Sequence, residues 1–200
     1  MWDPDYVDDS WIEDRVRLIP RLRQWVDTHY PGTRIGITEY HWGAENHING
    51  ATAQADLLGI FGREGLDLAV RWGTPAPSSP TYKAIKLYRN YDGQRSGFGN
   101  LSVAATGSNP DTVSAYAAVR TSDGALTVMV VGKFLSGSAN LTVDLMGFSP
   151  AGPAQVWQLT PANTLVRKAD RAVSGSRLTA TVPARSVTLF VIPGATRSFQ

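Results

Sequence analysis

Cysteine is absent from all 200 residues of the sequence. Its absence excludes disulfide bonds, thiolate metal sites and cysteine nucleophiles, although it does not decide the compartment. No apolar run approaches the roughly 20 residues that a membrane-spanning helix needs, so no membrane partner is expected. The first residues also lack the charged and apolar segments of a signal peptide. The protein is therefore expected either to be cytoplasmic or to have its natural N-terminus upstream.

A concentrated basic segment is also missing. The formal net charge is +2, and no run of Lys and Arg is longer than Arg167-Lys168. The first part of the chain is acidic and the second part is basic, but the basic residues are scattered along it. Nucleic-acid binding usually needs a clustered basic face, so we expect no nucleic-acid partner.

The region up to about residue 93 alternates predicted helices and strands. A Ser-x-x-Glu capping box at Ser10 predicts the start of a helix, which Pro20 should kink. Further helices are predicted over Ala51–Arg63 and from Ser79 to Tyr88. Between them lie two predicted strands, a β-rich run over Arg34–Tyr40 and a buried strand over Leu66–Trp72. Helix and strand in alternation indicate parallel strands covered by helices, and two strands are too few for a complete α/β domain.

The region after about residue 94 contains only short alternating runs. Turn residues separate these runs, and Ser122-Asp123-Gly124 is a strong hairpin signal. The spacing predicts an antiparallel β-sandwich. The predicted strands are Val113–Arg120, Leu126–Val131, Leu141–Leu145, Gln155–Leu159, Leu178–Val182 and Val187–Ile192.

The main candidate for catalysis is Glu39, the penultimate residue of the first predicted strand. In β/α barrels, catalytic groups lie where strands end and loops begin. A carboxylate at such a position can attack or stabilise an oxocarbenium-like centre of a sugar. Trp72 ends the next strand, and its ring could stack on a sugar in the same cleft. The alternatives are a salt-bridged Glu39 at a strand end and a Trp72 that only packs in a core or rim.

The other chemistry-bearing groups are less specific. His41, Glu45 and His47 match no zinc spacing, so no metal site is predicted. Asp3, Asp5, Asp8 and Asp9 lack the spacing of a calcium loop and are expected to form a solvated acidic rim. There is no glycine-rich phosphate loop and no serine nucleophile elbow.

Three segments together resemble glycoside hydrolase family 44, which contains endoglucanases and xyloglucanases. They are Trp2-Asp3-Pro4-Asp5-Tyr6-Val7, then Ile37-Thr38-Glu39-Tyr40-His41-Trp42-Gly43, then Ala53-Gln54-Ala55-Asp56-Leu57-Leu58-Gly59-Ile60-Phe61-Gly62-Arg63-Glu64-Gly65. The segment Tyr88–Gly93 and the β-rich end of the chain are also similar. The resemblance covers nearly the whole chain and identifies it as the C-terminal portion of such an enzyme.

The resemblance implies a fold and a set of site residues. Residues 1–93 would be the last two β/α units of a (β/α)8 barrel, and residues 94–200 a β-sandwich. Glu39 matches the family's nucleophile, at the end of barrel strand seven, and Trp72 matches an aromatic residue of the cleft at the end of strand eight. Tyr40, His41 and Trp42 are further substrate-binding candidates, with His41 in place of the family's usual Asn.

The resemblance also implies an activity and its limits. The family's enzymes hydrolyse β-1,4-glucan chains with retention of configuration, without a cofactor, and the parent enzyme would be secreted. The family's acid/base glutamate comes from barrel strand four, which these 200 residues do not supply. Because retaining hydrolysis needs two carboxyl groups about 5 Å apart, the chain alone is expected to be inactive without the missing N-terminal half of the barrel.

Two rival interpretations come from other classes. The β-sandwich could be a non-catalytic carbohydrate-binding module with a vestigial barrel segment, or the chain could be a non-functional truncated reading frame. A binding module would carry a flat, exposed row of aromatic rings. Its candidate aromatics are Tyr116, Phe134, Phe148 and Trp157, and most of them fall in or beside strands where core packing is expected.

Overall fold

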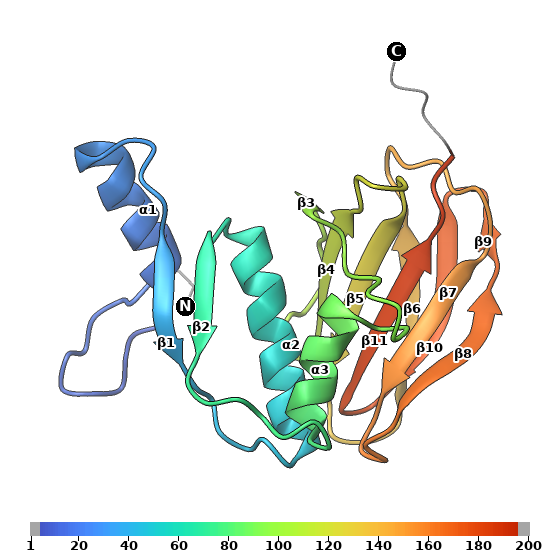
Figure 1. Cartoon of the computed structure of the whole chain (residues 1–200), viewed down its shortest axis with the longest axis horizontal. Helices are drawn as coiled ribbons and strands as arrows, with labels where there is room; N and C mark the ends of the chain where they lie inside the picture. The colour runs from blue at the N-terminus through green and yellow to red at the C-terminus, as the bar shows by residue number, and fades with distance from the viewer. Residues whose placement is uncertain (1–4, 196–200) are drawn as a thin grey trace. The chain divides into compact units, whose positions relative to one another are not determined.

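The computed structural model describes residues 5–195 (Figure 1). The chain divides into two compact units, Met1–His41 with Ile60–Thr74, and Trp42–Gly59 with Pro75–Gln200. Trp2, Asp3 and Pro4, which begin the first family-like segment, lie outside the described residues. No helix in the described range combines the length and apolar character that a bilayer crossing requires.

The first unit contains a helix and two parallel strands. Helix α1 (Leu18–His29) is followed by β1 (Gly36–Tyr40) and β2 (Leu68–Arg71), which form a two-stranded parallel sheet. Helix α2 (Ile48–Arg63) connects the strands and ends in this unit. The order helix, strand, helix, strand is the predicted one, and the parallel pairing confirms the interpretation of the alternation.

The start of α1 differs from the prediction. The helix begins at Leu18 rather than at the Ser10 capping box. The Ser10 hydroxyl instead contacts the Asp8 carboxylate and accepts a hydrogen bond from the Ile12 amide. Pro20 therefore lies in the first turn of the helix, where its missing N–H removes no hydrogen bond, and the predicted kink is wrong.

Strand β2 was predicted to be buried, and this is also wrong. Leu68 is 56% exposed and Val70 is 46% exposed, on the same face of the strand. Ala69 and Arg71, which alternate with them, are half-buried. The apolar run is typical of a strand with two covered faces, but in the first unit the face of Leu68 and Val70 has no covering element among the described residues.

The second unit contains two antiparallel sheets that share a core. The six-stranded sheet has the order β3-β4-β5-β11-β7-β8, and the three-stranded sheet has the order β6-β10-β9. Apolar side chains of β5, β7, β10 and β11 form the buried core between them. The strands are β3 (Leu101–Val103), β4 (Val113–Val119), β5 (Leu126–Gly132), β6 (Ser138–Asp144), β7 (Ala154–Leu159), β8 (Leu165–Arg171), β9 (Val173–Ser174), β10 (Arg177–Pro183) and β11 (Ser186–Ile192).

All six predicted β runs coincide with observed strands, and β4 and β5 form the predicted hairpin around Gly124. Gly124 has φ of 71°, which explains the glycine in this turn. Strands β3, β8 and β9 were not predicted. Strands β3 and β9 are very short, and β8 has the sequence LVRKADR, which contains no apolar alternation.

Helix α2 packs on the outer face of β4. Gly59 lies so close to the Tyr116 ring that an added Cβ would overlap it. The Asp56 carboxylate accepts hydrogen bonds from the hydroxyls of Ser114 and Tyr116, and its other oxygen lies 2.6 Å from Lys133 Nζ. A glycine contact and a carboxylate with three donors therefore fix this helix on the sheet.

Helix α3 (Pro80–Arg89) begins as predicted, with Ser79 as N-cap and Pro80 in the first turn. Leu87 is fully buried. The Tyr88 hydroxyl donates a hydrogen bond to the Ala55 carbonyl on α2, 3.0 Å away, and burial raises the pKa of Tyr88. Both helices are thereby joined to the β-rich region of the second unit.

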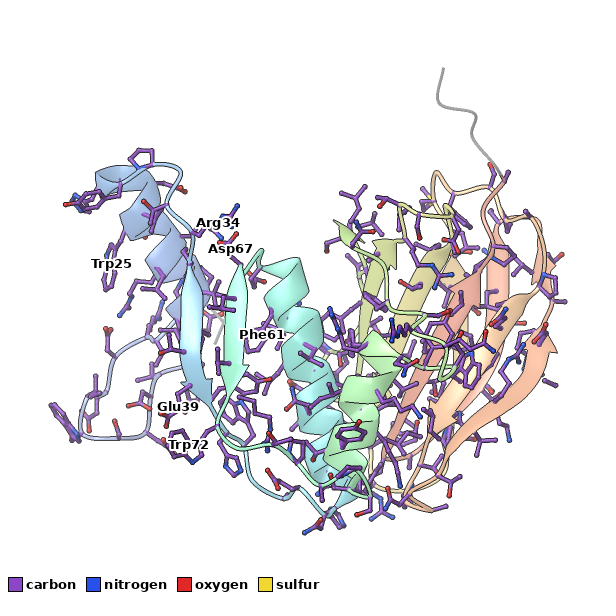
Figure 2. All side chains as sticks on the ribbon, viewed as in Figure 1. Trp25, Arg34, Glu39, Phe61, Asp67 and Trp72 are labelled. Carbon is purple, nitrogen blue, oxygen red and sulfur yellow. The ribbon has the colours of Figure 1, made fainter. Side chains whose placement is uncertain are left out.

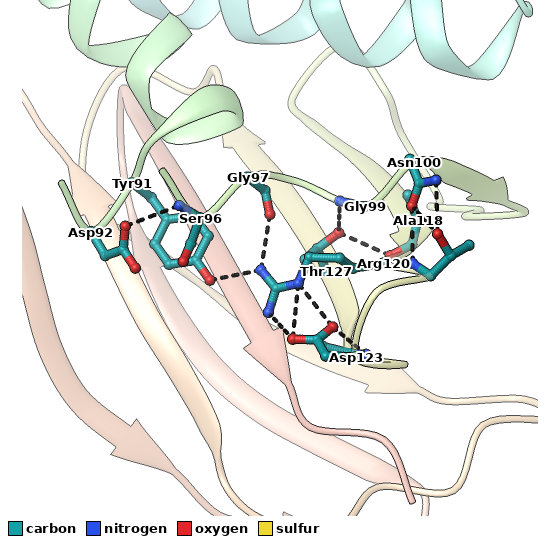
Figure 3. A network of polar contacts seen from close by, with 12 residues as sticks. Tyr91, Asp92, Ser96, Gly97, Gly99, Asn100, Ala118, Arg120, Asp123 and Thr127 are labelled. Atoms are coloured by element: carbon teal, nitrogen blue, oxygen red, sulfur yellow. Dashed lines mark hydrogen bonds and ion pairs between the residues drawn. The ribbon is translucent and has the colours of Figure 1, made fainter. Parts of the chain in front are cut away.

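The segment between α3 and β3 is tied to the β4–β5 hairpin by one arginine (Figure 3). Arg120 donates to both oxygens of Asp123, to the Tyr91 hydroxyl at 2.9 Å and to the Gly97 carbonyl at 3.0 Å. Thr127 accepts a hydrogen bond from the Gly99 amide at 2.8 Å. This network crosses the junction at which the sequence predicted a change of domain.

Candidate active site

Glu39 occupies a β-bulge near the end of β1. Ile37 is opposite Ala69 and Tyr40 is opposite Arg71, so Thr38 and Glu39 together face Val70. A bulge places an extra residue on one strand and changes the direction of its side chain. Thr38 and Glu39 are both exposed, whereas Ile37 and Tyr40 are half-buried. The bulge therefore presents the Glu39 carboxylate on the open side of the sheet.

Trp72 lies at the same end of the sheet as Glu39 (Figure 2). Its backbone N–H donates to the Tyr40 carbonyl at 2.9 Å, which continues the pairing one residue beyond β2. Its side chain is 64% exposed. The Arg71 guanidinium donates to the carbonyls of Trp72 and Gly73, at 3.1 and 2.7 Å. The backbone that carries this indole is thus fixed while its ring faces solvent.

Tyr40 has a different environment from its neighbour Glu39. Its ring packs edge-on against Phe61 of α2, with ring centroids 5.3 Å apart and an interplanar angle of 76°. Phe61 is buried. This contact holds the last residue of β1 against α2, whereas Glu39 beside it is exposed. A role of Tyr40 in substrate binding stays a prediction.

His41 and Trp42 follow the strand but belong to different compact units. His41 is exposed and closes the first unit, and Trp42 is 55% exposed and begins the second. Glu45 is half-buried in the second unit, where its carbonyl accepts a hydrogen bond from the Thr81 amide at 3.4 Å. The structure therefore brings Glu39, Tyr40, His41 and Trp72 together in one unit.

Two other carboxylates of the first unit, Asp67 and Glu64, precede strand β2. The Asp67 side chain accepts a hydrogen bond from the Ile35 amide at 2.8 Å, at the beginning of the strand pair. Glu64 is paired with Arg63 at 2.8 Å. Asp67 is not at the end of the sheet that carries Glu39 (Figure 2). Among residues 5–195, no group of three or more His, Asp or Glu side chains is placed to hold a metal ion.

Sequence reasoning missed two residues that support this site. Arg71 donates a hydrogen bond to the turn after β2, and the Phe61 ring packs against the Tyr40 ring. Arg71 carried a weak signal, because a charged residue interrupts an otherwise apolar strand directly before Trp72. Phe61 carried no sequence signal of a role in the site, beyond its place on the apolar side of α2.

The aromatic residues of the β-rich region do not form an exposed row. Tyr116 is buried, and Phe134, Phe148 and Trp157 are half-buried. Trp157 lies between Tyr91, with ring centroids 5.4 Å apart, and the Arg167 guanidinium, 5.7 Å from its ring centroid. In this part of the described chain, the aromatics therefore serve packing and do not favour a carbohydrate-binding module.

Comparison with known proteins gives a consistent set of relatives. Endoglucanase A of Paenibacillus lautus is 38% identical over 190 residues, which cover 92% of this chain and 27% of the relative. The crystal structure of CelM2, a bifunctional glucanase-xylanase from a metagenome library, is 63% identical and superposes with a TM-score of 0.95. A Paenibacillus polymyxa xyloglucanase of glycoside hydrolase family 44, solved with xyloglucan, is 34% identical with a TM-score of 0.88.

These likenesses extend over almost all of this chain but only part of each relative. The alignment with CelM2 covers 97% of this chain and 37% of that protein, and the alignment with the xyloglucanase covers 97% and 40%. The chain thus spans between a quarter and two fifths of the length of these three relatives. No protein-family model matches the chain.

Proposed function

Because the chain belongs to glycoside hydrolase family 44, we propose that it is the C-terminal portion of a retaining endo-β-1,4-glucanase of the cellulase or xyloglucanase type. Its substrate would be a β-1,4-glucan chain, and the chemistry needs no cofactor. The relatives support this assignment by their names, which include an endoglucanase, a glucanase-xylanase and a xyloglucanase. The parent enzyme is proposed to be secreted, since its polymeric substrate lies outside the cell.

The proposed architecture is a barrel segment followed by a β-sandwich. Residues 1–93 would supply the last two β/α units of a (β/α)8 barrel, with β1 and β2 as its final strands. The parallel pairing of these strands and the helix between them support that assignment. Residues 94–200 would form the sandwich, which two antiparallel sheets around one apolar core support.

The observation that carries the mechanism is the position of Glu39 and Trp72 at one end of one sheet. In a parallel β/α barrel the catalytic groups lie at the C-terminal ends of the strands. Glu39 would attack the anomeric carbon and form a glycosyl-enzyme, while a second carboxylic acid protonates the leaving oxygen and then activates water. Trp72 would hold a sugar ring by stacking against its C–H face.

The second carboxylic acid is proposed to come from the other six β/α units of the barrel, which lie outside residues 1–200. Asp67, the carboxylate that directly precedes β2, lies toward the opposite end of the strand pair, where it accepts a hydrogen bond from the Ile35 amide. Retaining enzymes hold the two carboxyl groups about 5 Å apart. The 200-residue chain alone would therefore bind and position substrate poorly and turn over little of it.

A chimeric enzyme tests this proposal with a complete active site. The segment of CelM2 that aligns with this chain would be replaced by residues 1–200, which the 63% identity makes practicable. We expect the chimera to hydrolyse xyloglucan or carboxymethylcellulose. A 2-deoxy-2-fluoro cellobiosyl substrate should trap a covalent adduct on the peptide that contains Glu39.

Three variants of the chimera assign the roles. Glu39→Gln should lower kcat by at least about 10³-fold, as removal of a nucleophile does, and should abolish the adduct. Trp72→Ala should raise KM more than it lowers kcat, because stacking contributes to binding. Glu45→Gln is the matched carboxylate control and should change kcat less than about twofold. A chimera whose adduct forms on another residue, or whose Glu39→Gln variant stays active, would refute the assignment.

A further inference from the structure

The turn that follows β2 carries the exposed indole of Trp72. The next residue, Gly73, has a φ of 72°, so the chain turns here in a conformation that suits glycine. A Cβ added to Gly73 would meet no atom within 4 Å, which shows that this side of the turn is open. With 64% of Trp72 exposed, packing holds little of the ring, and its direction depends on what fixes the backbone of the turn.

Both polar groups of the Trp72 backbone are hydrogen-bonded. The N–H donates to the Tyr40 carbonyl at 2.9 Å. The carbonyl accepts from one guanidinium nitrogen of Arg71 at 3.1 Å, and the same nitrogen donates to the Gly73 carbonyl at 2.7 Å. This nitrogen therefore fixes the peptide planes on both sides of Gly73. Because side-chain rotamers are defined relative to the backbone, it also fixes the base from which the indole points.

Arg71 reaches the turn from the side of the sheet opposite to the indole. Side chains alternate along a strand, and the half-buried residues of β2 are Ala69 and Arg71. Arg71 is opposite Tyr40, whose ring packs against α2. The exposed Trp72 lies at the end of the sheet that carries Glu39 (Figure 2). The guanidinium is thus bonded to the backbone of the turn from behind the face on which a sugar would lie.

We propose that Arg71 is a positioning residue for substrate binding and that it acts through Trp72. The inference rests on the proposed function, in which the indole stacks against a sugar ring of the glucan chain. A binding group must be held within about 0.5 Å and 10–20° of its productive geometry to be effective. Arg71 orients the indole before the substrate arrives, so binding does not have to supply the free energy that orders it.

Two other roles of Arg71 lead to different results. If the guanidinium contacted the glucan directly, its removal would weaken binding whether or not the indole is present. If it only stabilised the fold, its removal would lower the free energy of unfolding and leave the KM of the folded enzyme unchanged. A positioning role requires an effect on KM that disappears when the indole is absent.

A double-mutant cycle in the CelM2 chimera separates these roles. Arg71→Met removes both hydrogen bonds and keeps an unbranched side chain. We expect it to raise the KM for xyloglucan at least about threefold and to change kcat less than about twofold. In the Trp72→Ala background the same substitution should change KM less than about 1.5-fold, because the two residues act as one unit. Arg71→Lys, which still offers a charged donor to the two carbonyls, should be closer to the parent than Arg71→Met.

Arg23→Met is the matched control. The Arg23 guanidinium donates to the carbonyl of Gly65 at 2.6 Å, and Gly65 is another glycine with positive φ, located before β2. The control therefore removes the same kind of bond away from the turn, and it should change KM less than about 1.5-fold. An unchanged KM in Arg71→Met, an equal rise in Arg23→Met, or a rise that persists in the Trp72→Ala background would each overturn the proposal.

A spectroscopic measurement on the 200-residue chain does not depend on catalysis. Labelling with 5-fluorotryptophan places one fluorine on each of the six tryptophans, and Trp72→Phe identifies the signal of Trp72 by its loss. Arg71→Met should shift and sharpen this signal, because the indole then samples several orientations. Arg71→Lys and Arg23→Met should leave it near its parent position. A Trp72 signal that Arg71→Met does not change would overturn the proposal.

The two proposals can be told apart by their failures. A chimera that is labelled on a residue other than Glu39 would refute the proposed function, and the role of Arg71 in substrate binding with it. A chimera that is labelled on Glu39, but whose KM and Trp72 signal do not respond to Arg71→Met, would uphold the proposed function and refute this inference alone.

Discussion

Substitution of Gly59 by alanine tests how α2 is fixed on the β-rich region. Alanine normally stabilises a helix interior by about 1 kcal/mol relative to glycine. At Gly59, however, the new Cβ would overlap the base and edge of the Tyr116 ring. That ring cannot simply move away, because it is buried and its hydroxyl donates to Asp56 at 3.1 Å. Helix and strand must therefore separate, or Tyr116 must leave its position.

The structure sets the sign of the effect and its approximate size. Overpacking of a core contact costs about 1–3 kcal/mol. Loss of a hydrogen bond to a charged group costs about 1.5–3 kcal/mol more if Tyr116 is displaced. After the helical gain of about 1 kcal/mol is subtracted, we expect Gly59→Ala to lower the free energy of unfolding by up to about 2 kcal/mol, and by roughly 1.5–5 kcal/mol if Tyr116 is displaced. Gly62 lies on the same helix with no atom within 4 Å of its added Cβ, so Gly62→Ala should raise it by about 0.5 kcal/mol.

Urea denaturation followed by far-ultraviolet circular dichroism measures both variants against the parent chain. The midpoints should move in opposite directions, with Gly59→Ala lower and Gly62→Ala slightly higher. Equal slopes of the transitions would show that stability, and not the denatured state, has changed. A Gly59→Ala variant as stable as Gly62→Ala would refute the close packing of α2 on Tyr116.

Three further outcomes are expected. The Arg120 guanidinium holds the pKa of Asp123 below its ordinary value of 3.8, so this ion pair stabilises the fold above about pH 4 and its contribution is lost as the pH falls through the lower folded pKa. The stability difference between the parent and Asp123→Asn should accordingly be full at pH 6 and shrink below pH 4 in urea titrations. Arg120→Met should make the segment around Arg95 susceptible to trypsin, whereas the parent should resist cleavage there; equal cleavage rates would count against the network. The isolated 200-residue chain and its Glu39→Gln variant should give equal, background-level rates on xyloglucan, and turnover abolished by the substitution would show that a carboxylate present here replaces the missing acid.

The family and the order of elements could be predicted because they depend on local sequence patterns. The segment that surrounds Glu39 and the segment Ala53–Gly65 identified family 44, and the relatives confirm that identification. Alternating apolar residues located six strands correctly, and Ser79 with Pro80 located the start of α3. Each of these features is encoded within about ten consecutive residues.

Features that depend on distant partners could not be predicted. Ser10 and Glu13 match the sequence pattern of a capping box, but the Ser10 hydroxyl contacts Asp8 and the helix starts eight residues later. Strand β8 is stabilised by pairing with β7, although its own residues are mostly charged. The donors to Asp56 come from β4 and from Lys133, far along the chain. In all three cases a contact outside the local pattern determines the structure.

The site shows the same division between local and distant causes. That Glu39 lies near the end of a strand is visible in the sequence, but the direction of its side chain depends on the bulge, and the residue after it, Tyr40, packs against the distant Phe61. The open face that carries Glu39 and Trp72 is also the face on which Leu68 and Val70 are exposed. On the proposed architecture, the barrel strands that would bring the acid/base carboxylate would also cover these apolar side chains. The same strands would then bury Leu68 and Val70 and place the acid/base carboxylate opposite Glu39, so the barrel and the catalytic pair would be completed together.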